Sequence, residues 1–482
     1  MRSDQRSTFE LLVDGNPVTL DEIALDDDPA EAEHLLARIT AECPASARPP
    51  RRAPGPRRTR RIALLAAAAA LAVATPLIAI EVGHNRPSPA IATHPRTPGT
   101  HKVPAWHLVG DVLPPGFQIE STTDGEPWNL SCGSSSFCIW TGGIGPDDRS
   151  AVMATHDGGK TWSEAYAAPT NETLAGSTCP AATTCMVLAM DTRTTGLRTP
   201  MMLLTLDAGA NWKSLPVRAA MTKFAQFSCT SSLDCVVTGL GKSPFAAVTS
   251  DGGATWMTGT LPSNFLPLGV QCFSAQRCVA RGTVATAGHL LTTGEIADST
   301  DGGHTWEMAS LPSGTPRLAA LACSPTGQCV TVTTVAQRTS GASGTFTTVV
   351  DGVLVSNDSG RTWTAAAGTG IATANAPPLL TVMALSCPAA TTCWASGSSH
   401  PQPGATGGAL STSYRGVVFQ TTDGGQRWDE ATLPATAAQM GWVSSITCPT
   451  MAACFAVASS LTGSPNGSAT VLSTDQNAPS PS

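Results

Sequence analysis

An eight-residue segment that recurs along the chain constrains its fold more than any other feature. Ser299–Trp306 reads Ser-Thr-Asp-Gly-Gly-His-Thr-Trp, and close copies are Thr155–Trp162 and Thr249–Trp256. Three looser copies keep the hydroxyl residue, the Asp, the second Gly position and the Trp at the same spacing. They are Thr205–Trp212, Ser356–Trp363 and Thr421–Trp428. Six copies of one segment indicate a repeat architecture, in which each copy marks one supersecondary unit.

Each position of the segment has a physical role. The Asp side chain accepts hydrogen bonds from backbone amides just ahead of it and closes a turn. Gly tolerates the positive φ of a tight hairpin, and the Ser and Thr hydroxyls bind the remaining turn dipoles. The Trp opens the next strand and buries a large ring. The predicted structural residues are Asp157, Trp162, Asp207, Trp212, Asp251, Trp256, Asp301, Trp306, Asp358, Trp363, Asp423 and Trp428.

The pattern Ser/Thr-x-Asp-x-Gly-x-Thr-Trp resembles the Asp-box, or BNR, repeat of sialidase-like and sortilin-like β-propellers. The resemblance covers residues from about 105 to 476 and implies an all-β propeller whose boxes are structural turns. It extends to non-enzymatic proteins as well, among them BNR-repeat assembly factors of photosynthetic membranes and sortilin-type receptors. The resemblance therefore implies a fold and leaves the activity open.

The cysteines follow the same repeat, since fourteen of the fifteen form seven pairs with the spacing Cys-x5-Cys. An apolar or alternating stretch precedes each pair, a polar stretch lies within it and an apolar stretch follows. This predicts a hairpin with the two cysteines facing each other across it, in disulfide geometry. Each bridge would restrict the unfolded chain by about 2 kcal/mol. The pairs are Cys132/Cys138, Cys179/Cys185, Cys229/Cys235, Cys272/Cys278, Cys323/Cys329, Cys387/Cys393 and Cys448/Cys454.

Metal binding is the alternative use of paired cysteines. The spacing is not a common zinc spacing, and no histidine cluster accompanies any pair. We therefore expect disulfides, with no metal and no cofactor.

Each repeat runs in the order strand, cysteine hairpin, strand, loop, strand, box, strand. Four strands in about 50 residues predict a propeller blade, and seven cysteine pairs predict seven blades. Widened spacing places insertions around Thr364–Leu380 and Ser398–Gly416. Their Gly-, Ala-, Ser-, Thr- and Pro-rich composition predicts loops.

Only six boxes are complete, so one blade lacks its turn. Ala469–Asp475 reads as a third strand that runs into the start of a box, and Ala105–Pro114 resembles the segment Thr305–Pro312 after a complete box. We predict that the N-terminal strand is the outer strand of the seventh blade. The seventh box would then be split between Asp475 and Trp106, and the ring would have no exposed strand edge at its seam.

The first hundred residues predict an anchor. Residues 1–50 carry eleven acidic side chains against four arginines, which predicts an acidic cytoplasmic segment, partly helical or disordered, or alternatively a docking element. Residues 51–61 are Arg-rich, and residues 62–82 contain an uncharged run, Ile62–Ile80, long enough for one transmembrane helix. Residues 83–104 form a Pro-rich spacer, the propeller spans 105–476, and 477–482 form a disordered tail.

Arginines on the N-terminal side of the span place the N-terminus in the cytoplasm and the propeller outside. The cysteines fit this arrangement, since only the unpaired Cys43 lies on the cytoplasmic side. A secretory peptide cleaved after Ala72-Val73-Ala74 is the alternative to a signal anchor. The Ala- and Arg-rich, Lys-poor composition favours a bacterial membrane protein.

Composition and motifs limit the function. A net charge of −7 argues against a nucleic-acid binder. A sialidase needs an arginine triad and a Tyr–Glu pair, yet the only tyrosines are Tyr166 and Tyr414, and Glu is scarce after Val103. Paired carboxylates in a long cleft, as a glucanase needs, are not evident either. No catalytic residue is predicted.

The predicted function is a membrane-anchored, extracytoplasmic and non-catalytic propeller that binds a protein or glycan on one face, or assists assembly. The alternative is a sialidase-like glycoside hydrolase acting outside the cell. Trp140 and Trp394 follow second cysteines and are predicted core residues, whereas Trp442 is a candidate for an exposed contact.

Overall fold

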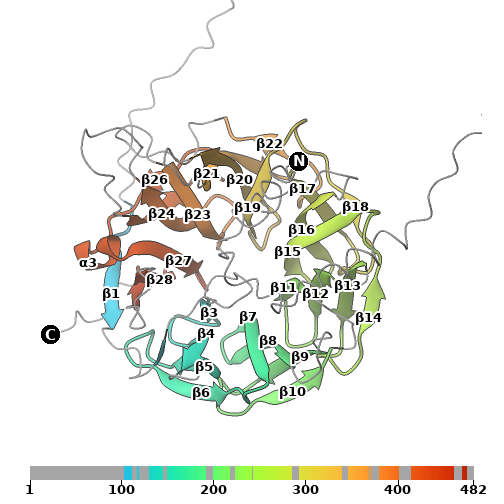
Figure 1. The fold of residues 1–482 in the computed structure, drawn as a ribbon, viewed down its shortest axis with the longest axis vertical. Coiled ribbons are helices and arrows are strands. Elements are labelled where there is room, and N and C mark those ends of the chain that lie inside the picture. Colours follow the sequence, from blue (N-terminus) through green and yellow to red (C-terminus); the bar gives the residue numbers. More distant parts are fainter. Residues whose placement is uncertain are drawn as a thin grey trace, which may run out of the picture. The chain divides into compact units, whose positions relative to one another are not determined.

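Seven antiparallel sheets stand around a central axis in the computed structural model of the protein (Figure 1). This confirms the predicted all-β, seven-bladed propeller. The residues that the structure describes are 103–110, 117–118, 130–144, 149–191, 199–217, 223–240, 243–284, 293–338, 346–367, 371, 379–400, 414–460 and 469–474. They belong to one unit of the chain.

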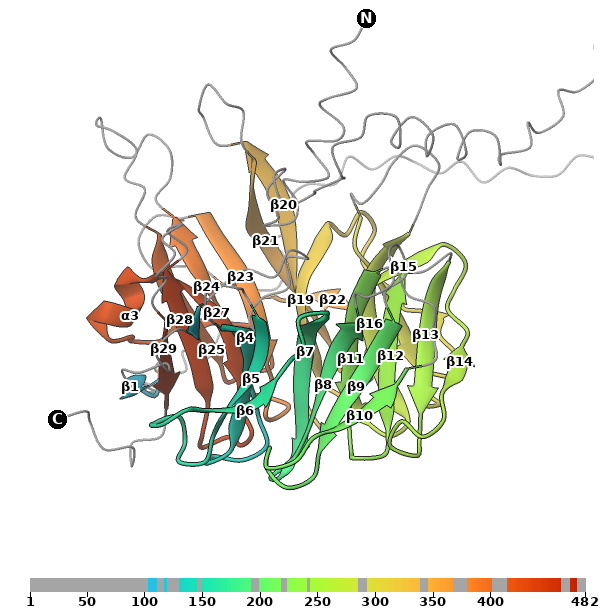
Figure 2. The ribbon, with the colours of Figure 1, turned by 60° about the horizontal axis from the view of Figure 1, so that its bottom comes forward.

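Each blade has an inner strand near the axis and an outer strand at the rim (Figures 1 and 2). Blade 1 consists of β2 (Phe117–Gln118), β3 (Leu130–Cys132), β4 (Cys138–Ile144), β5 (Arg149–Thr155) and β6 (Ser163–Ala167). Blade 2 consists of β7 (Glu172–Ala181), β8 (Thr184–Asp191), β9 (Thr199–Thr205) and β10 (Lys213–Pro216). Blade 3 consists of β11 (Lys223–Cys229), β12 (Cys235–Leu240), β13 (Pro244–Thr249) and β14 (Met257–Gly259). Blade 4 consists of β15 (Phe265–Ser274), β16 (Arg277–Val284), β17 (Glu295–Ser299) and β18 (Glu307–Met308). Blade 5 consists of β19 (Arg317–Cys323), β20 (Cys329–Arg338), β21 (Phe346–Ser356) and β22 (Thr364–Ala365). Blade 6 consists of β23 (Leu379–Ser386), β24 (Cys393–His400), β25 (Arg415–Thr421) and β26 (Asp429–Glu430). Blade 7 consists of β27 (Gly441–Thr447), β28 (Phe455–Ser460), β29 (Ala469–Ser473) and β1 (His107–Gly110). Helix α3 (Ala435–Gln439) lies between β26 and β27 in the sequence.

The core lies between blades rather than within one. Seven of the eight residues of β8 are buried, because neighbouring blades cover both of its faces. One cluster joins Met186 and Met202 of blade 2 to Phe227 and Val237 of blade 3, and similar clusters join other neighbouring blades. Apolar second strands therefore form the middle of the ring, whereas short outer strands such as β10 are mostly exposed.

The strand order gives the ring two different faces. The cysteine hairpin and the turn between third and fourth strands lie on the same face, which we call the hairpin face. The connections from second to third strands lie on the other face, which we call the loop face. All seven predicted cysteine pairs are disulfides on the hairpin face. The Cα atoms of each pair are 3.9–4.1 Å apart, and in four blades the two cysteines are direct partners in the strand ladder.

The second cysteine of each pair belongs to the core, which sequence analysis did not foresee. Each lies within one residue of the start of its blade's second strand, and none is more than 2% exposed. These residues are Cys138, Cys185, Cys235, Cys278, Cys329, Cys393 and Cys454. The cysteine spacing predicts a hairpin at the end of a blade, but a hairpin pattern carries no information about what the next blade covers.

Two of these cysteines show where the burial comes from. Cys185 of blade 2 is 0% exposed and belongs to the same apolar cluster as Ile139 of blade 1. Cys454 of blade 7 is 1% exposed and belongs to a cluster with Val418 of blade 6. The preceding blade therefore covers each of them, so Cys185 and Cys454 are packed structural residues and are not accessible to a ligand.

Blade 1 departs from the repeat. Its inner strand consists of two pieces, since β2 and β3 both pair with β4. Phe117 lies opposite Ile144 near the loop face, and Cys132 lies opposite Cys138 at the hairpin face.

The N-terminal strand closes the ring as predicted. β1 pairs with β29 and is the outer strand of the seventh blade, with His107 opposite Ser473. The Trp106 side chain is 2% exposed and packs edge-on against Trp394 of blade 6 at 5.4 Å between ring centroids. The Trp106 amide donates to the Thr432 carbonyl oxygen at 3.2 Å. Asp475, the other half of the predicted split box, lies outside the described residues.

The predicted acidic segment, membrane span and tail also lie outside the described residues, as does the spacer up to residue 102. Within the part of the chain that the structure describes, no helix is long and apolar enough to cross a membrane. The span at 62–82 remains a prediction.

Trp106→Ala tests the closure. Removing this buried ring should lower the free energy of unfolding by about 3–5 kcal/mol, because the indole fills the seam between blades 6 and 7. Trp363→Ala, in a complete repeat, is the matched comparison and should cost a similar amount. Urea unfolding followed by tryptophan fluorescence measures both. A loss below about 1 kcal/mol for Trp106→Ala alone would show that the N-terminal strand does not hold the ring.

Candidate functional site

The repeated turns share one set of hydrogen bonds. In the first, the Thr155 hydroxyl donates to Asp157 Oδ1 at 2.8 Å and accepts from the Gly159 amide at 2.8 Å. The Thr161 amide donates to Asp157 Oδ1 at 2.9 Å, and the Thr161 hydroxyl donates to Oδ2 at 2.6 Å. The other five complete copies repeat these contacts, with Asn211 or Arg427 in place of the second Thr in two of them. The repeated Asp residues therefore hold turns together.

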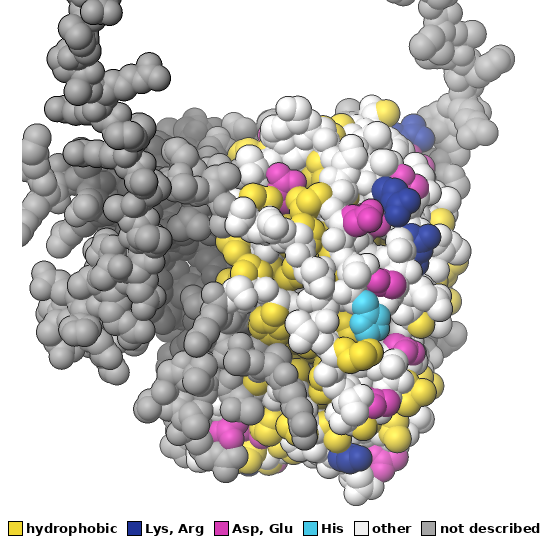
Figure 3. All heavy atoms as spheres, turned by 90° about the vertical axis from the view of Figure 1, so that its right-hand side faces the viewer, with side chains coloured by type: hydrophobic (Ala, Val, Ile, Leu, Met, Phe, Trp, Pro, Cys, Tyr) yellow, Lys and Arg dark blue, Asp and Glu magenta, His cyan; other side chains and the backbone are white. Residues whose placement is uncertain are grey.

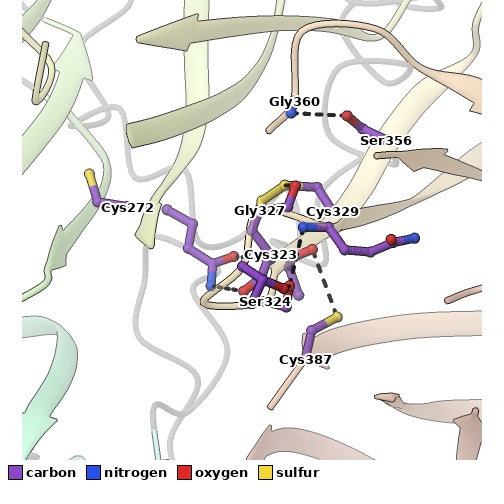
Figure 4. Close-up of a disulfide and its surroundings, with 12 residues drawn as sticks. Cys272, Cys323, Ser324, Gly327, Cys329, Ser356, Gly360 and Cys387 are labelled. Carbon is purple, nitrogen blue, oxygen red and sulfur yellow. Dashed lines mark hydrogen bonds between the residues drawn. A yellow bond between two sulfur atoms is a disulfide. The ribbon is translucent and has the colours of Figure 1, made fainter. Parts of the chain in front are cut away.

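A further bond ties each turn to the cysteine hairpin of its own blade. The Gly302 amide, directly after Asp301, donates to the carbonyl oxygen of Gln276, two residues before Cys278. Equivalent bonds occur in the other five complete copies, from Gly158, Ala208, Gly252, Ser359 and Gly424. Figure 4 shows the hairpin that carries the Cys323–Cys329 disulfide, with the Ser356 and Gly360 contact of the adjoining turn.

The amide that makes this bond lies in a left-handed backbone conformation. φ is +74° at Gly302 and +67° at Ser359. The turn thus uses positive φ at two successive positions, and the residue directly after the Asp need not be Gly. Sequence analysis predicted one glycine of positive φ in each turn and missed the second position of positive φ, because Ala208 and Ser359 occupy it in two of the looser copies.

Hydrogen bonding lowers the pKa of every Asp in the six complete turns. Burial raises the pKa of Asp301, but hydrogen bonds from Thr305 and Ser299 outweigh it and bring the pKa below its ordinary value. The Thr255 hydroxyl is the largest influence on Asp251 and lowers its pKa. Similar bonds lower the pKa of Asp157, Asp207, Asp358 and Asp423. The folded turn therefore stabilises the charged carboxylate of each of these Asp residues.

The Trp of each turn connects neighbouring blades. The Trp306 amide donates to the Thr260 carbonyl oxygen of the preceding blade at 3.1 Å, and the Trp363 amide donates to Ser310 at 2.9 Å. Trp106 and Thr432 form the same contact at the seam. The Trp residues of the repeat are structural anchors, and the N-terminal Trp106 occupies an equivalent place.

The loop face differs from blade to blade where the hairpin face repeats. Every cysteine hairpin has five residues between its cysteines. The connection from second to third strand ranges from three residues at 241–243 to fourteen at 401–414. One face is therefore uniform, and the other varies in length.

Side chains vary in the same way at the loop-face end of the inner strands. In six blades, the fifth residue after the second cysteine lies on the second strand and pairs with a residue of the inner strand. These six inner-strand residues therefore occupy equivalent positions in the fold. The residues are Thr173, Lys223, Leu266, Arg317, Thr381 and Trp442. A position that packed the ring together would need one residue type, as the Asp and Trp of the turns do.

Trp442 forms an aromatic pair that sequence analysis did not foresee. Its ring stacks on Tyr414 with centroids 5.3 Å apart and an interplanar angle of 28°, and Tyr414 is 42% exposed. Gly441, with φ +92°, precedes Trp442, and its carbonyl oxygen accepts a 2.7 Å bond from the buried Ser398 hydroxyl. The expectation of an exposed contact at Trp442 thus becomes a fixed pair at the edge of blades 6 and 7. Trp140 and Trp394 are buried, as predicted.

Tyr166 also has an unforeseen partner. Its hydroxyl donates to Glu172 at 2.9 Å, and Glu172 is 7% exposed. Burial and the Glu172 carboxylate raise the pKa of Tyr166 above its ordinary value. A carboxylate bonded to a tyrosine hydroxyl can act as its general base, but Glu172 is buried, so a substrate has little access to this pair. Tyr166 also lies on the outer strand β6, away from the axis.

The hairpin face contains a small pit between blades 3 and 4. Asp234, Asp301 and His304 are among its lining residues, and its volume is about 50 Å³. This is room for a few water molecules and far below the volume of a ligand pocket. His156, the other turn histidine, stacks on Phe137. Among the described residues, no group of three or more His, Cys, Asp or Glu is arranged to hold a metal ion.

The rim carries mixed side chains. Figure 3 shows it from the side of blades 3 and 4, where acidic, basic and apolar groups are interspersed. Met257 on β14 and Met308 on β18 are exposed there. No charge of one sign gathers in the described part of this view.

Comparison with known proteins does not assign the chain to a family. No protein-family model matches the chain, and no curated protein matches it. Solved structures that resemble it include YCF48 bound to D1 peptide (13% identity, 76% of this chain, 96% of that chain, TM-score 0.45) and YCF48 from Cyanidioschyzon merolae (12%, 77%, 99%, 0.47). Another is the GH93 α-L-arabinofuranosidase of Fusarium graminearum with arabinobiose (10%, 77%, 97%, 0.39). Likenesses this distant say nothing about the activity of this chain.

Two substitutions at equivalent turn positions test the tie between turn and hairpin. Gly302→Ala should destabilise the protein by more than about 1 kcal/mol, since a left-handed alanine is strained. Its Cβ would also lie 2.6 Å from the Ala275 carbonyl oxygen. Ser359→Gly should stabilise it by about 1 kcal/mol by removing strain of the same kind. Thermal unfolding measures both, and equal signs for the two variants would contradict this account.

Acid should weaken the ring through its turns. Each turn Asp has a folded pKa below its ordinary value of 3.8, so its contribution to stability is present above pH 4 and is lost as pH falls through the folded pKa. Asp298 acts in the opposite direction, because burial raises its pKa. We expect the six turns to outweigh it, so the urea midpoint should fall steadily below pH 4. Asp301→Asn should show a shallower fall than the parent protein, and an unchanged slope would contradict the proposed role.

Proposed function

We propose that this chain is a non-catalytic binding or assembly module that presents its loop face to a protein or glycan outside the cytoplasm. One observation carries the proposal. On the hairpin face, the cysteine pairs, the turn Asp and Trp residues and their bonds repeat in six blades, whereas the loop face differs at equivalent positions. Residues that maintain the ring must be alike, and residues that recognise a ligand need not be.

The position and fixation of the aromatic pair support the same face. Tyr414 and Trp442 lie where blades 6 and 7 reach the loop face, and a buried hydroxyl and a left-handed glycine hold them. A rigid aromatic pair offers contact area at little cost in conformational entropy. We propose it as one contact of the binding face.

The proposed location rests on the sequence. The segment 62–82, with its uncharged run Ile62–Ile80, anchors the chain in the membrane, with its N-terminus in the cytoplasm. Seven disulfides in the propeller suit an oxidising compartment. The propeller belongs to the Asp-box repeat proteins in this proposal, and the shared turn bonds support that membership.

A glycoside hydrolase is the second candidate, because Glu172 and Asp191 lie directly opposite each other where blade 2 reaches the loop face. Opposed residues of a sheet hold carboxylates at about the separation that retaining glycosidases use. However, Glu172 is bound to Tyr166 and 7% exposed, so a substrate has little access to it. We propose the binding module as the function.

A photo-crosslinking amino acid at two exposed sites tests the binding face. With the reagent at Tyr414 on the loop face, irradiation of the protein's own cells should give a discrete adduct. Met451, 63% exposed in a cysteine hairpin, is the matched control and should give none. Biotinylation of intact cells by a reagent that does not cross membranes should label the exposed Lys160.

Adducts from Met451 in place of Tyr414 would contradict the proposed face, and unlabelled Lys160 in intact cells would contradict the location. Hydrolysis of a fluorogenic sialoside or arabinoside that disappears with Glu172→Gln would overturn the non-catalytic role. The Asp301→Asn variant, changed in a structural turn, is the control for that assay.

A further inference from the structure

The hairpin β20–β21 is longer than its counterpart in any other blade. Its ladder joins ten residue pairs, whereas the second and third strands of the other blades are joined by five to seven. In Figure 2 these two strands rise beyond their neighbours at the loop face. The extra length forms a two-stranded ribbon, which we define as Val335–Arg338 and Phe346–Val350.

Both edges of the ribbon lack a strand partner among the described residues. On one side, the pairing of β19 ends with Arg317 opposite Thr334. On the other side, β22 pairs only with Leu354 and Val355, and the Ala366 amide adds one bond to the Val353 carbonyl oxygen. Alternate backbone amides and carbonyls of the ribbon therefore point away from its ladder on each side.

The ribbon has few of the features by which proteins protect sheet edges. Elsewhere the outer strands have two to five residues, and several carry charge, such as Lys213, Glu307 and Glu430. The segments Val332–Gln337 and Phe346–Val350 contain no proline and no charged residue, and eight of their eleven residues are Val or Thr. Short length, proline and charge are the usual protections. Within the ribbon, Arg338 at the outer end is the one charged residue, and Asp351 is left out of the ladder at its base.

We infer that an extended, uncharged and β-prone segment of a partner protein adds to this ribbon as a further strand. Backbone amides and carbonyls in a row are complementary to another strand, and strand addition of this kind is a known mode of peptide recognition. The inference rests on the binding role proposed above and deepens it, since it names the ligand as a polypeptide and the ribbon as its site.

A second copy of this chain fits the ribbon less well than a partner segment. The ribbon has four ladder pairs beyond Thr334, which corresponds to about 13 Å of rise. Two ribbons paired antiparallel would bring two loop faces about that close. The fourteen-residue connection 401–414 of each copy would have to fit between them. A single extended segment needs no such room.

Selection of peptides on the whole protein tests the inference. A displayed library of random peptides should yield sequences rich in Val, Ile and Thr without internal proline. A synthetic peptide of the selected sequence should slow amide hydrogen exchange in the ribbon. Its affinity should fall at least about tenfold when its alternate amides are N-methylated, because those amides form the new ladder.

Proline variants locate the strand. Ala336→Pro and Gln337→Pro are a matched pair on β20, and Thr348→Pro and Val349→Pro are one on β21. Amides at successive positions face opposite sides of a strand, so one member of each pair leaves the ribbon ladder intact. The variant that leaves the ladder intact is identified by unchanged amide hydrogen exchange of the ribbon in the absence of peptide. On the edge that binds the peptide, this variant should lower peptide affinity at least about tenfold.

Three outcomes would overturn the inference. They are selection of no peptide above background, protection of amides outside the ribbon, and unchanged peptide affinity in every proline variant. A dimer in sedimentation equilibrium that these variants dissociate would assign the ribbon to a second copy instead. An adduct at Tyr414 combined with any of these outcomes would leave the proposed function standing and remove only the ribbon as its site.

Discussion

The bond from a turn amide to the carbonyl beside a disulfide is the contact on which the regularity of this ring depends. A hairpin turn by itself fixes two strands, and a disulfide by itself fixes two others. The amide of Gly302 and its equivalents join the two hairpins, so the ends of all four strands of a blade are held at one face. One such bond contributes only about 1 kcal/mol, yet it sets the register in which the larger apolar contacts between blades form.

The same contact explains what could be predicted from the sequence. Turns, disulfides and blade number follow from residues a few positions apart, and such short-range chemistry leaves a visible pattern. Closure was predictable because Ala105–Pro114 resembles a segment that follows a complete box, and β1 pairs with β29 accordingly. Asp475, by contrast, lies outside the described residues, so the Asp half of the split box remains a prediction.

The features that sequence analysis missed depend on contacts between blades. The stacking of Tyr414 on Trp442 joins two blades, and the Tyr166–Glu172 bond joins two others. The full burial of Cys185 and Cys454 likewise comes from the blade before each of them, which the spacing of a cysteine pair does not reveal.

Sequence analysis also missed local backbone conformations that the residue types do not indicate. Sequence analysis did not predict the two-piece inner strand of blade 1, in which β2 and β3 both pair with β4. The left-handed residues Ala208 and Ser359 were hidden because neither type favours that conformation.

Fixing one face of the ring leaves the other free to vary. Lengthening a connection on the loop face costs little, because the entropy of a loop grows only slowly with its length. The hairpin β20–β21 goes further, since its extra residues are in a ladder rather than in a loop. A two-stranded ribbon without covering layers is marginal in water. A third strand would add a second ladder and shield one edge of the ribbon, so an added polypeptide would stabilise it.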